Sequence, residues 1–226
     1  MNIFHFDGKL YRFLVKFWNI IWIGILWIIF SIPVFTIGAS SSAAYYAMMK
    51  AVRKGLERPT HEFFKSFKEN FKQGSILTVI YGIIGALFVF AFLFYYHQPG
   101  EIALGMRWLF LVLLLIYVSA ATLCFIWLSR FVITTGRAVT YPMMLAVLHP
   151  KQTFGLVVFW LASAVILYWT YNTPAFLFLL LFLPGFKCYA DTFVAESLLE
   201  KYEPIAEGTG EKAEESEEKN ETFYES

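Results

Sequence analysis

Long stretches without a charged residue constrain this chain more than any other feature of its sequence. Residues 17–37, 76–96 and 108–128 are uncharged throughout, and each stretch is 21 residues long. Residues 154–170 and 175–186 form two shorter uncharged runs. A helix needs about 20 apolar residues to cross the roughly 30 Å hydrocarbon layer of a bilayer. The sequence therefore predicts an all-α fold, a polytopic bundle of transmembrane helices.

The amino-acid composition supports this class. Hydrophobic residues make up 58% of the 226-residue chain and charged residues 15%, whereas soluble domains average about 45–50% and about 25%. The same values exclude a disordered protein, and two cysteines are too few for a small disulfide-stabilised scaffold.

The distribution of Lys and Arg predicts which loops face the cytoplasm, because cytoplasmic loops retain positive charge. Region 50–72 contains seven Lys and Arg residues, whereas loop 96–106 contains none. We therefore expect region 50–72 to be cytoplasmic and loop 96–106 to lie on the opposite side. By the same rule, region 129–153 returns to the cytoplasm and the turn at 171–174 lies outside.

The N-terminal region needs two helices to satisfy this rule, because a single crossing would leave Lys9, Arg12 and Lys16 outside. Pro33 disfavours a continuous helix there, and cap-type and small residues follow it. The alternative is a chain of five spans with an external N-terminus. We predict six membrane-embedded helices in three hairpins joined by interfacial helices, with both termini in the cytoplasm, at 17–32, 36–52, 75–96, 107–129, 154–171 and 174–194.

An amphipathic segment, 60–72, connects the first two hairpins. Its Phe residues recur at helical spacing on one face and its Lys residues lie on the other. This pattern predicts an interfacial helix along the cytoplasmic leaflet that contacts anionic lipids or a protein partner. The residues expected to make these contacts are Phe63, Phe64, Lys65, Phe67, Lys68, Phe71 and Lys72.

Charge also divides the chain into two parts. Residues 1–195 carry 15 Lys and Arg against 6 Asp and Glu, whereas residues 196–226 carry 3 against 11. A Glu-rich segment with few aliphatic residues cannot bury enough surface to offset its ordering entropy. We therefore predict a transmembrane helical domain over 1–202 and a disordered acidic cytoplasmic tail over 203–226. The tail is either a solvating end or an acidic patch for a basic partner or for region 50–72.

Lys187 and Asp191 are the first candidates for a solute site. They are four residues apart on one face of the last predicted helix, and ionisable residues inside a membrane mark functional sites by default. The alternative is that both lie near the cytoplasmic end, where Lys187 extends to the interface and Asp191 pairs locally.

The turn at 36–42 is the second candidate. A helix N-terminus with free amides and hydroxyls there would hold an anionic or polar solute. The alternative is a capped turn whose small residues permit close helix packing. The candidate residues are Thr36, Gly38, Ser40, Ser41 and Ser42.

Groups that carry catalysis are missing from the sequence. It contains no nucleophile motif, paired carboxylates or phosphate-binding loop, and its four His residues lack metal-ligand spacing. We therefore predict no catalytic residues, no metal site and no cofactor, and a protein that is not an enzyme.

Three segments carry a family resemblance: 31–40 (SIPVFTIGAS), 44–46 (AYY) and 63–73 (FFKSFKENFKQ). They resemble the signature of the YesL-like family of bacterial membrane proteins, over about the first third of the chain. The acidic tail departs from the family pattern. The resemblance implies a bacterial cytoplasmic membrane protein of uncharacterised activity, often encoded beside carbohydrate-uptake ABC transporters.

The resemblance also implies a role. We expect a non-enzymatic protein that assists or regulates a carbohydrate ABC-type uptake system, in contact with anionic lipids and with the permease or ATPase subunits. No nucleic-acid partner is expected, and the oligomeric state stays open. The alternative is a small-solute transporter or channel in its own right.

Overall fold

The computed structural model describes residues 9–54, 59–131, 134–176 and 179–196. Within these ranges the chain is helical and contains no strand, which confirms the all-α class. The predicted tail at 203–226 lies outside the described residues.

The first hydrophobic stretch breaks at Pro33. α1 (Lys9–Phe30) ends before it, the short 3-10 helix η1 (Val34–Thr36) follows, and α2 (Ile37–Lys54) begins directly afterwards. The hydroxyl of Thr36 lies 2.6 Å from the carbonyl oxygens of both Phe30 and Pro33 and donates to them. The turn between α1 and α2 is therefore closed by its own residues.

α3 (Pro59–Tyr96) is one helix of 38 residues. The sequence predicted two elements here, an interfacial helix at 60–72 and a span at 75–96, and in this respect the structure differs. At 1.5 Å per residue α3 is about 57 Å long, nearly twice the thickness of the hydrocarbon layer. The change from polar to apolar residues alters the surroundings of the helix but not its backbone, and no proline interrupts it.

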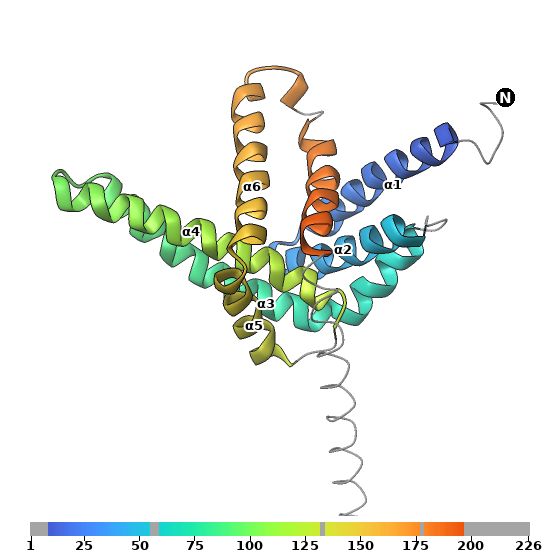
Figure 1. The fold of residues 1–226 in the computed structure, drawn as a ribbon, viewed down its shortest axis with the longest axis horizontal. Coiled ribbons are helices and arrows are strands. Elements are labelled where there is room, and N and C mark those ends of the chain that lie inside the picture. Colours follow the sequence, from blue (N-terminus) through green and yellow to red (C-terminus); the bar gives the residue numbers. More distant parts are fainter. Residues whose placement is uncertain (1–8, 55–58, 132–133, 177–178, 197–226) are drawn as a thin grey trace, which may run out of the picture.

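The described residues of the second half of the chain form further helices. α4 (Glu101–Leu128) returns beside α3, and the shorter α5 (Thr135–Leu148) and α6 (Pro150–Thr170) follow. Residues 179–196 form a last helical segment. In Figure 1, α3 and α4 run side by side across the view, while α6 and segment 179–196 run vertically.

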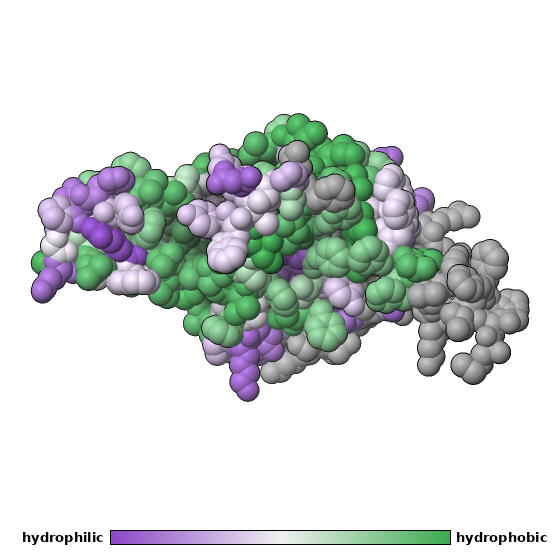
Figure 2. Space-filling model, turned by 90° about the horizontal axis from the view of Figure 1, so that it is seen from above, coloured by the Kyte–Doolittle hydropathy of each residue, from purple (hydrophilic) through white to green (hydrophobic). Residues whose placement is uncertain are grey.

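Four described helices are long and apolar enough to cross a membrane, judged by length and composition: α1, α3, α4 and α6. α2 and segment 179–196 are helical but each carries three charged residues. Figure 2 shows hydrophobic residues over much of the visible face, with a group of hydrophilic ones at the left end, where α3 turns into α4, and smaller groups elsewhere. A surface of this kind is what a lipid-facing protein requires.

α2 is the most buried helix of the fold. Its Ala39, Ala43, Ala47 and Met48 have no exposed surface. Small residues let neighbouring backbones approach closely: a Cβ added to Gly74 of α3 would lie 2.7 Å from the backbone nitrogen of Ala39. α2 therefore forms the centre around which α1, α3 and α4 pack.

The phenylalanine face at the start of α3 packs on α1. Phe63 has no exposed surface, and its ring centroid lies 5.7 Å from that of Phe30. The rings of Phe64 and Phe67 each lie 5.1 Å from the same Phe30 ring. Of the four phenylalanines expected to contact lipid or a partner, only Phe71 is largely exposed, at 42%. This part of α3 is amphipathic because α1 covers its phenylalanine face.

Candidate functional site

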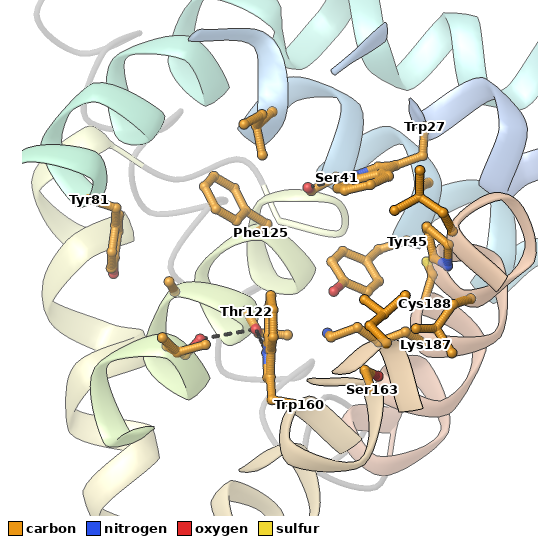
Figure 3. A pocket seen from close by; sticks show the side chains of 18 of the residues that line it. Trp27, Ser41, Tyr45, Tyr81, Thr122, Phe125, Trp160, Ser163, Lys187 and Cys188 are labelled. Atoms are coloured by element: carbon orange, nitrogen blue, oxygen red, sulfur yellow. Dashed lines mark hydrogen bonds between the residues drawn. The ribbon is translucent and has the colours of Figure 1, made fainter. Parts of the chain in front are cut away.

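A cavity of about 490 Å³ lies between the first hairpin, α4 and the C-terminal elements (Figure 3). α1 contributes Trp27, α2 contributes Ser41 and Tyr45, and α6 contributes Trp160 and Ser163. The wall is otherwise largely apolar. The remaining lining residues are Ile37, Ala44, Tyr81, Tyr117, Val118, Ala121, Thr122, Phe125, Leu167, Leu180, Leu183, Pro184, Lys187 and Cys188.

Lys187 and Asp191 form an ion pair at one wall of this cavity. They lie four residues apart on segment 179–196, as helical spacing requires, and Lys187 Nζ donates to Asp191 Oδ2. Asp191 is fully buried, whereas the Lys187 side chain keeps 14% of its surface exposed. The lysine thus reaches the cavity while its partner stays behind it.

Tyr45 ties this pair to α2. Its hydroxyl donates a 2.9 Å hydrogen bond to Asp191 Oδ2, the same oxygen that accepts from Lys187. The other oxygen, Oδ1, is buried and has no hydrogen-bond partner among the described residues. Among the described residues, one carboxylate oxygen of Asp191 therefore accepts two donors and the other accepts none.

Trp160 of α6 faces the lysine from the opposite side. Lys187 Nζ lies 4.1 Å from the centroid of its ring, within the range of a cation–π contact. The Trp160 indole donates to Thr122 Oγ1 at 3.0 Å, which fixes the orientation of the ring. In Figure 3 the side chains of Tyr45, Trp160 and Lys187 point toward one another.

Ile37 and Ser41 of the 36–42 turn line the cavity, and the Ser41 hydroxyl accepts a 2.9 Å hydrogen bond from the Trp27 indole. The other polar groups of the turn are engaged within the protein. The Gly38 amide donates to Thr78 Oγ1 at 2.8 Å, the Ser40 hydroxyl lies 2.6 Å from that of Ser31, and the Ser42 hydroxyl donates to a carbonyl of its own helix. This geometry favours the capped packing turn over a solute site made of backbone amides.

The lysines expected to meet lipid or a partner lie outside the cavity. Lys65, Lys68 and Lys72 are exposed on α3. Nearby, Lys50 of α2 donates to Glu62 of α3 at 2.6 Å. This hydrogen bond raises the pKa of the Lys50 ammonium and lowers the pKa of the Glu62 carboxyl, at the polar ends of both helices.

The cavity joins residues that sequence reasoning proposed separately with residues that it missed. The sequence proposed Lys187 and Ser41 as separate candidates, and both line this cavity. Trp27, Tyr45 and Trp160 were not proposed, because an aromatic residue in a hydrophobic stretch carries no local sign of lining a cavity. Among the described residues no group of His, Cys, Asp and Glu side chains is arranged to hold a metal ion.

Part of the chain is similar to a known protein family. Residues 20–92 match the family described as "Protein of unknown function, DUF624". The matched part extends from α1 through most of α3 and includes the 36–42 turn. No curated protein and no solved structure matches the chain. Much of the cavity, including Trp160 and Lys187, is contributed by residues after the matched part.

Proposed function

We propose that this chain is a membrane protein that binds a small solute in the cavity and acts as a small-solute transporter. The observation that carries the proposal is the Lys187–Asp191 pair at the cavity wall. Charged side chains inside a bilayer are costly, so they are kept where they serve a solute or ion path. A cavity of about 490 Å³ also falls within the range of roughly 300–1,000 Å³ that small-molecule sites occupy.

Binding can be tested on the protein in lipid nanodiscs. A panel of sugars, organic acids and amines is screened for ligands that raise the thermal unfolding temperature. Ser163→Trp should abolish the effect, because Ser163 lines the cavity and a large indole would fill it. Val165→Trp on the same helix is the control, since Val165 is 57% exposed. A ligand that stabilises both variants equally binds elsewhere and contradicts the proposal.

Transport is tested separately in proteoliposomes. A solute that passes the binding screen should accumulate in vesicles that contain the wild-type protein and not in vesicles with Ser163→Trp. Binding without uptake would reduce the proposal to a solute-binding membrane protein without transport.

The YesL-like resemblance favours a second candidate, a non-enzymatic accessory subunit of a carbohydrate ABC-type uptake system in the bacterial cytoplasmic membrane. Its support is the residue pattern at 31–40, 44–46 and 63–73, which lies within the part that matches an uncharacterised family. Affinity purification from native membranes should then recover a permease or ATPase subunit. Repeated recovery of the protein alone would exclude this candidate.

Both candidates share a topology in which region 50–72 faces the cytoplasm and loop 96–106 faces the opposite side of the membrane. Single cysteines at Gln98 and Lys68, which are both exposed, would report it once Cys124 and Cys188 are replaced by Ala. An impermeant thiol reagent added to intact cells should label the Gln98→Cys variant and not the Lys68→Cys variant. Labelling of Lys68→Cys alone would reverse the topology.

A further inference from the structure

The hydrogen-bond pattern of Asp191 leaves its Oδ1 atom available to accept a proton. Tyr45 and Lys187 both donate to Oδ2, and Oδ1 is buried without a partner among the described residues. An ionised carboxylate in a low-dielectric interior needs a counter-ion, and here Lys187 supplies it. If the lysine is shared with a second anion, the charge of Asp191 loses its compensation. Protonation on Oδ1 would restore neutrality and leave the Tyr45 hydrogen bond to Oδ2 in place.

Lys187 is placed to take such a second anion. Its ammonium lies between Asp191 and the ring of Trp160, and it lines the cavity itself. Aromatic rings of Trp160, Tyr45 and Phe125 form much of the surrounding wall. A solute with a flat apolar body would pack on these rings, while a carboxylate on the same solute would reach Lys187.

We infer that the solute of this cavity is a small organic carboxylate with a flat apolar body, and that its binding is coupled to the uptake of one proton by Asp191. This inference rests on the proposed function, because it names the ligand class and the coupling of the same cavity. In the free protein Asp191 is ionised and paired with Lys187. In the complex the solute carboxylate pairs with Lys187, and the proton resides on Asp191 Oδ1.

Among the residues that the structure describes, few other ionisable groups face Asp191. Tyr45 approaches from α2 and keeps its own proton as the donor of the hydrogen bond. Lys187 and the buried Cys188 belong to the same helical segment. From α6, the indole of Trp160 faces Lys187 without a charge. Asp191 is therefore the acceptor of the proton when the solute brings a negative charge.

The coupling is tested by titrating the full chain in nanodiscs with 2-naphthoate and with its neutral analogue 2-naphthamide, using empty nanodiscs as the blank. The carboxylate stays ionised from about pH 8 to about pH 6. Its Kd should tighten over this interval by up to about tenfold per pH unit, with one proton taken up per ligand in buffers of different ionisation enthalpy. The Kd of 2-naphthamide should not change with pH.

Two variants sharpen the test. Asp191→Asn mimics the protonated acid, so 2-naphthoate should bind it without proton uptake and with a Kd that no longer depends on pH. Adding Lys187→Met to Asp191→Asn removes the cation without leaving a buried unpaired carboxylate. The double variant should lose the preference of the wild-type protein for 2-naphthoate over 2-naphthamide.

The outcomes separate this inference from the proposed function. Cavity-dependent binding of neutral solutes, with no preference for the carboxylate or with no proton uptake by the wild-type protein, would overturn the inference and leave the solute-binding function standing. If no solute of either kind is sensitive to Ser163→Trp, the proposed function itself fails. The wild-type measurements decide the matter even where a variant does not fold.

Discussion

Gly24 of α1 and Gly185 of segment 179–196 cross with their backbones in contact: a Cβ added to Gly24 would lie 2.7 Å from the backbone nitrogen of Gly185. The contact joins the first long helix to the last helical segment, which carries Lys187 and Asp191. Neither glycine is needed for a turn. Both are required by the closeness of the two backbones, which brings the charged pair next to Tyr45.

Replacing either glycine should loosen this crossing. Gly24→Val places side-chain atoms against the Gly185 backbone, which cannot turn away as a side chain could, so we expect a loss of stability of about 1–3 kcal/mol or more. Gly82→Val on α3 is the matched control, because nothing lies within 4 Å of a Cβ at Gly82. Thermal unfolding in detergent compares the two, and equal unfolding temperatures would contradict the observed contact.

Phe63 should behave as a core residue. It has no exposed surface and packs on Phe30, so Phe63→Ala should cost about 3–5 kcal/mol of stability. Phe71→Ala, on the exposed part of the same helix, should cost much less. The comparison uses the same unfolding assay. If the two substitutions had equal effects, the phenylalanine face would lie on lipid and not on α1.

Tyr45→Phe removes the hydrogen bond to Asp191 and keeps the ring. Because the acceptor is a buried charged group, we expect a loss of about 1.5–3 kcal/mol. Tyr189→Phe, on the exposed side of segment 179–196, serves as the control and should be close to neutral. A neutral Tyr45→Phe variant would show that α2 and the charged pair are not energetically linked.

The Lys50–Glu62 pair should give a small, pH-dependent contribution. Both side chains are partly exposed, at 29% and 19%, so a double-mutant cycle with Lys50→Met and Glu62→Gln should give a coupling of about 0.2–1 kcal/mol that weakens at high salt.

The pH dependence of this coupling follows from the lowered pKa of Glu62. A carboxyl whose pKa is lowered on folding stabilises the fold at pH values above its ordinary pKa. This contribution is lost as the pH falls through the pKa that the carboxyl has in the folded protein. The coupling should therefore be full at neutral pH and disappear in acid. A coupling that grew on acidification would contradict the assigned hydrogen bond.

The first part of α3, residues 60–72, could be predicted from the sequence only in part. The pattern of Phe and Lys at 60–72 correctly indicates a helix with two different faces, but it does not say what covers the apolar one. The sequence favoured lipid or a partner protein, whereas Phe30 of α1 covers it. Likewise, the sequence predicted separate elements at 60–72 and 75–96, and the backbone continues from one to the other because no proline interrupts the helix.

The candidate site was predictable only in part. Lys187 and Asp191 could be paired from their spacing of four residues on one helix, which is a local relationship. The third member, Tyr45, is 146 residues away from Asp191 in the chain. Trp160 belongs to yet another helix, and nothing in its neighbourhood along the chain distinguishes it from a lipid-facing tryptophan.

The sequence by itself determined that the chain is helical, where its long apolar helices lie, and that the first of them breaks at Pro33. These features depend on residues close together in the chain, through runs of apolar side chains and the steric effect of proline. The tertiary structure alone decided which apolar faces meet protein, and that Tyr45, Trp160 and Lys187 surround one cavity. The physical reason is that lipid and protein interior are equally apolar, so an apolar face in the sequence does not reveal which of the two it contacts.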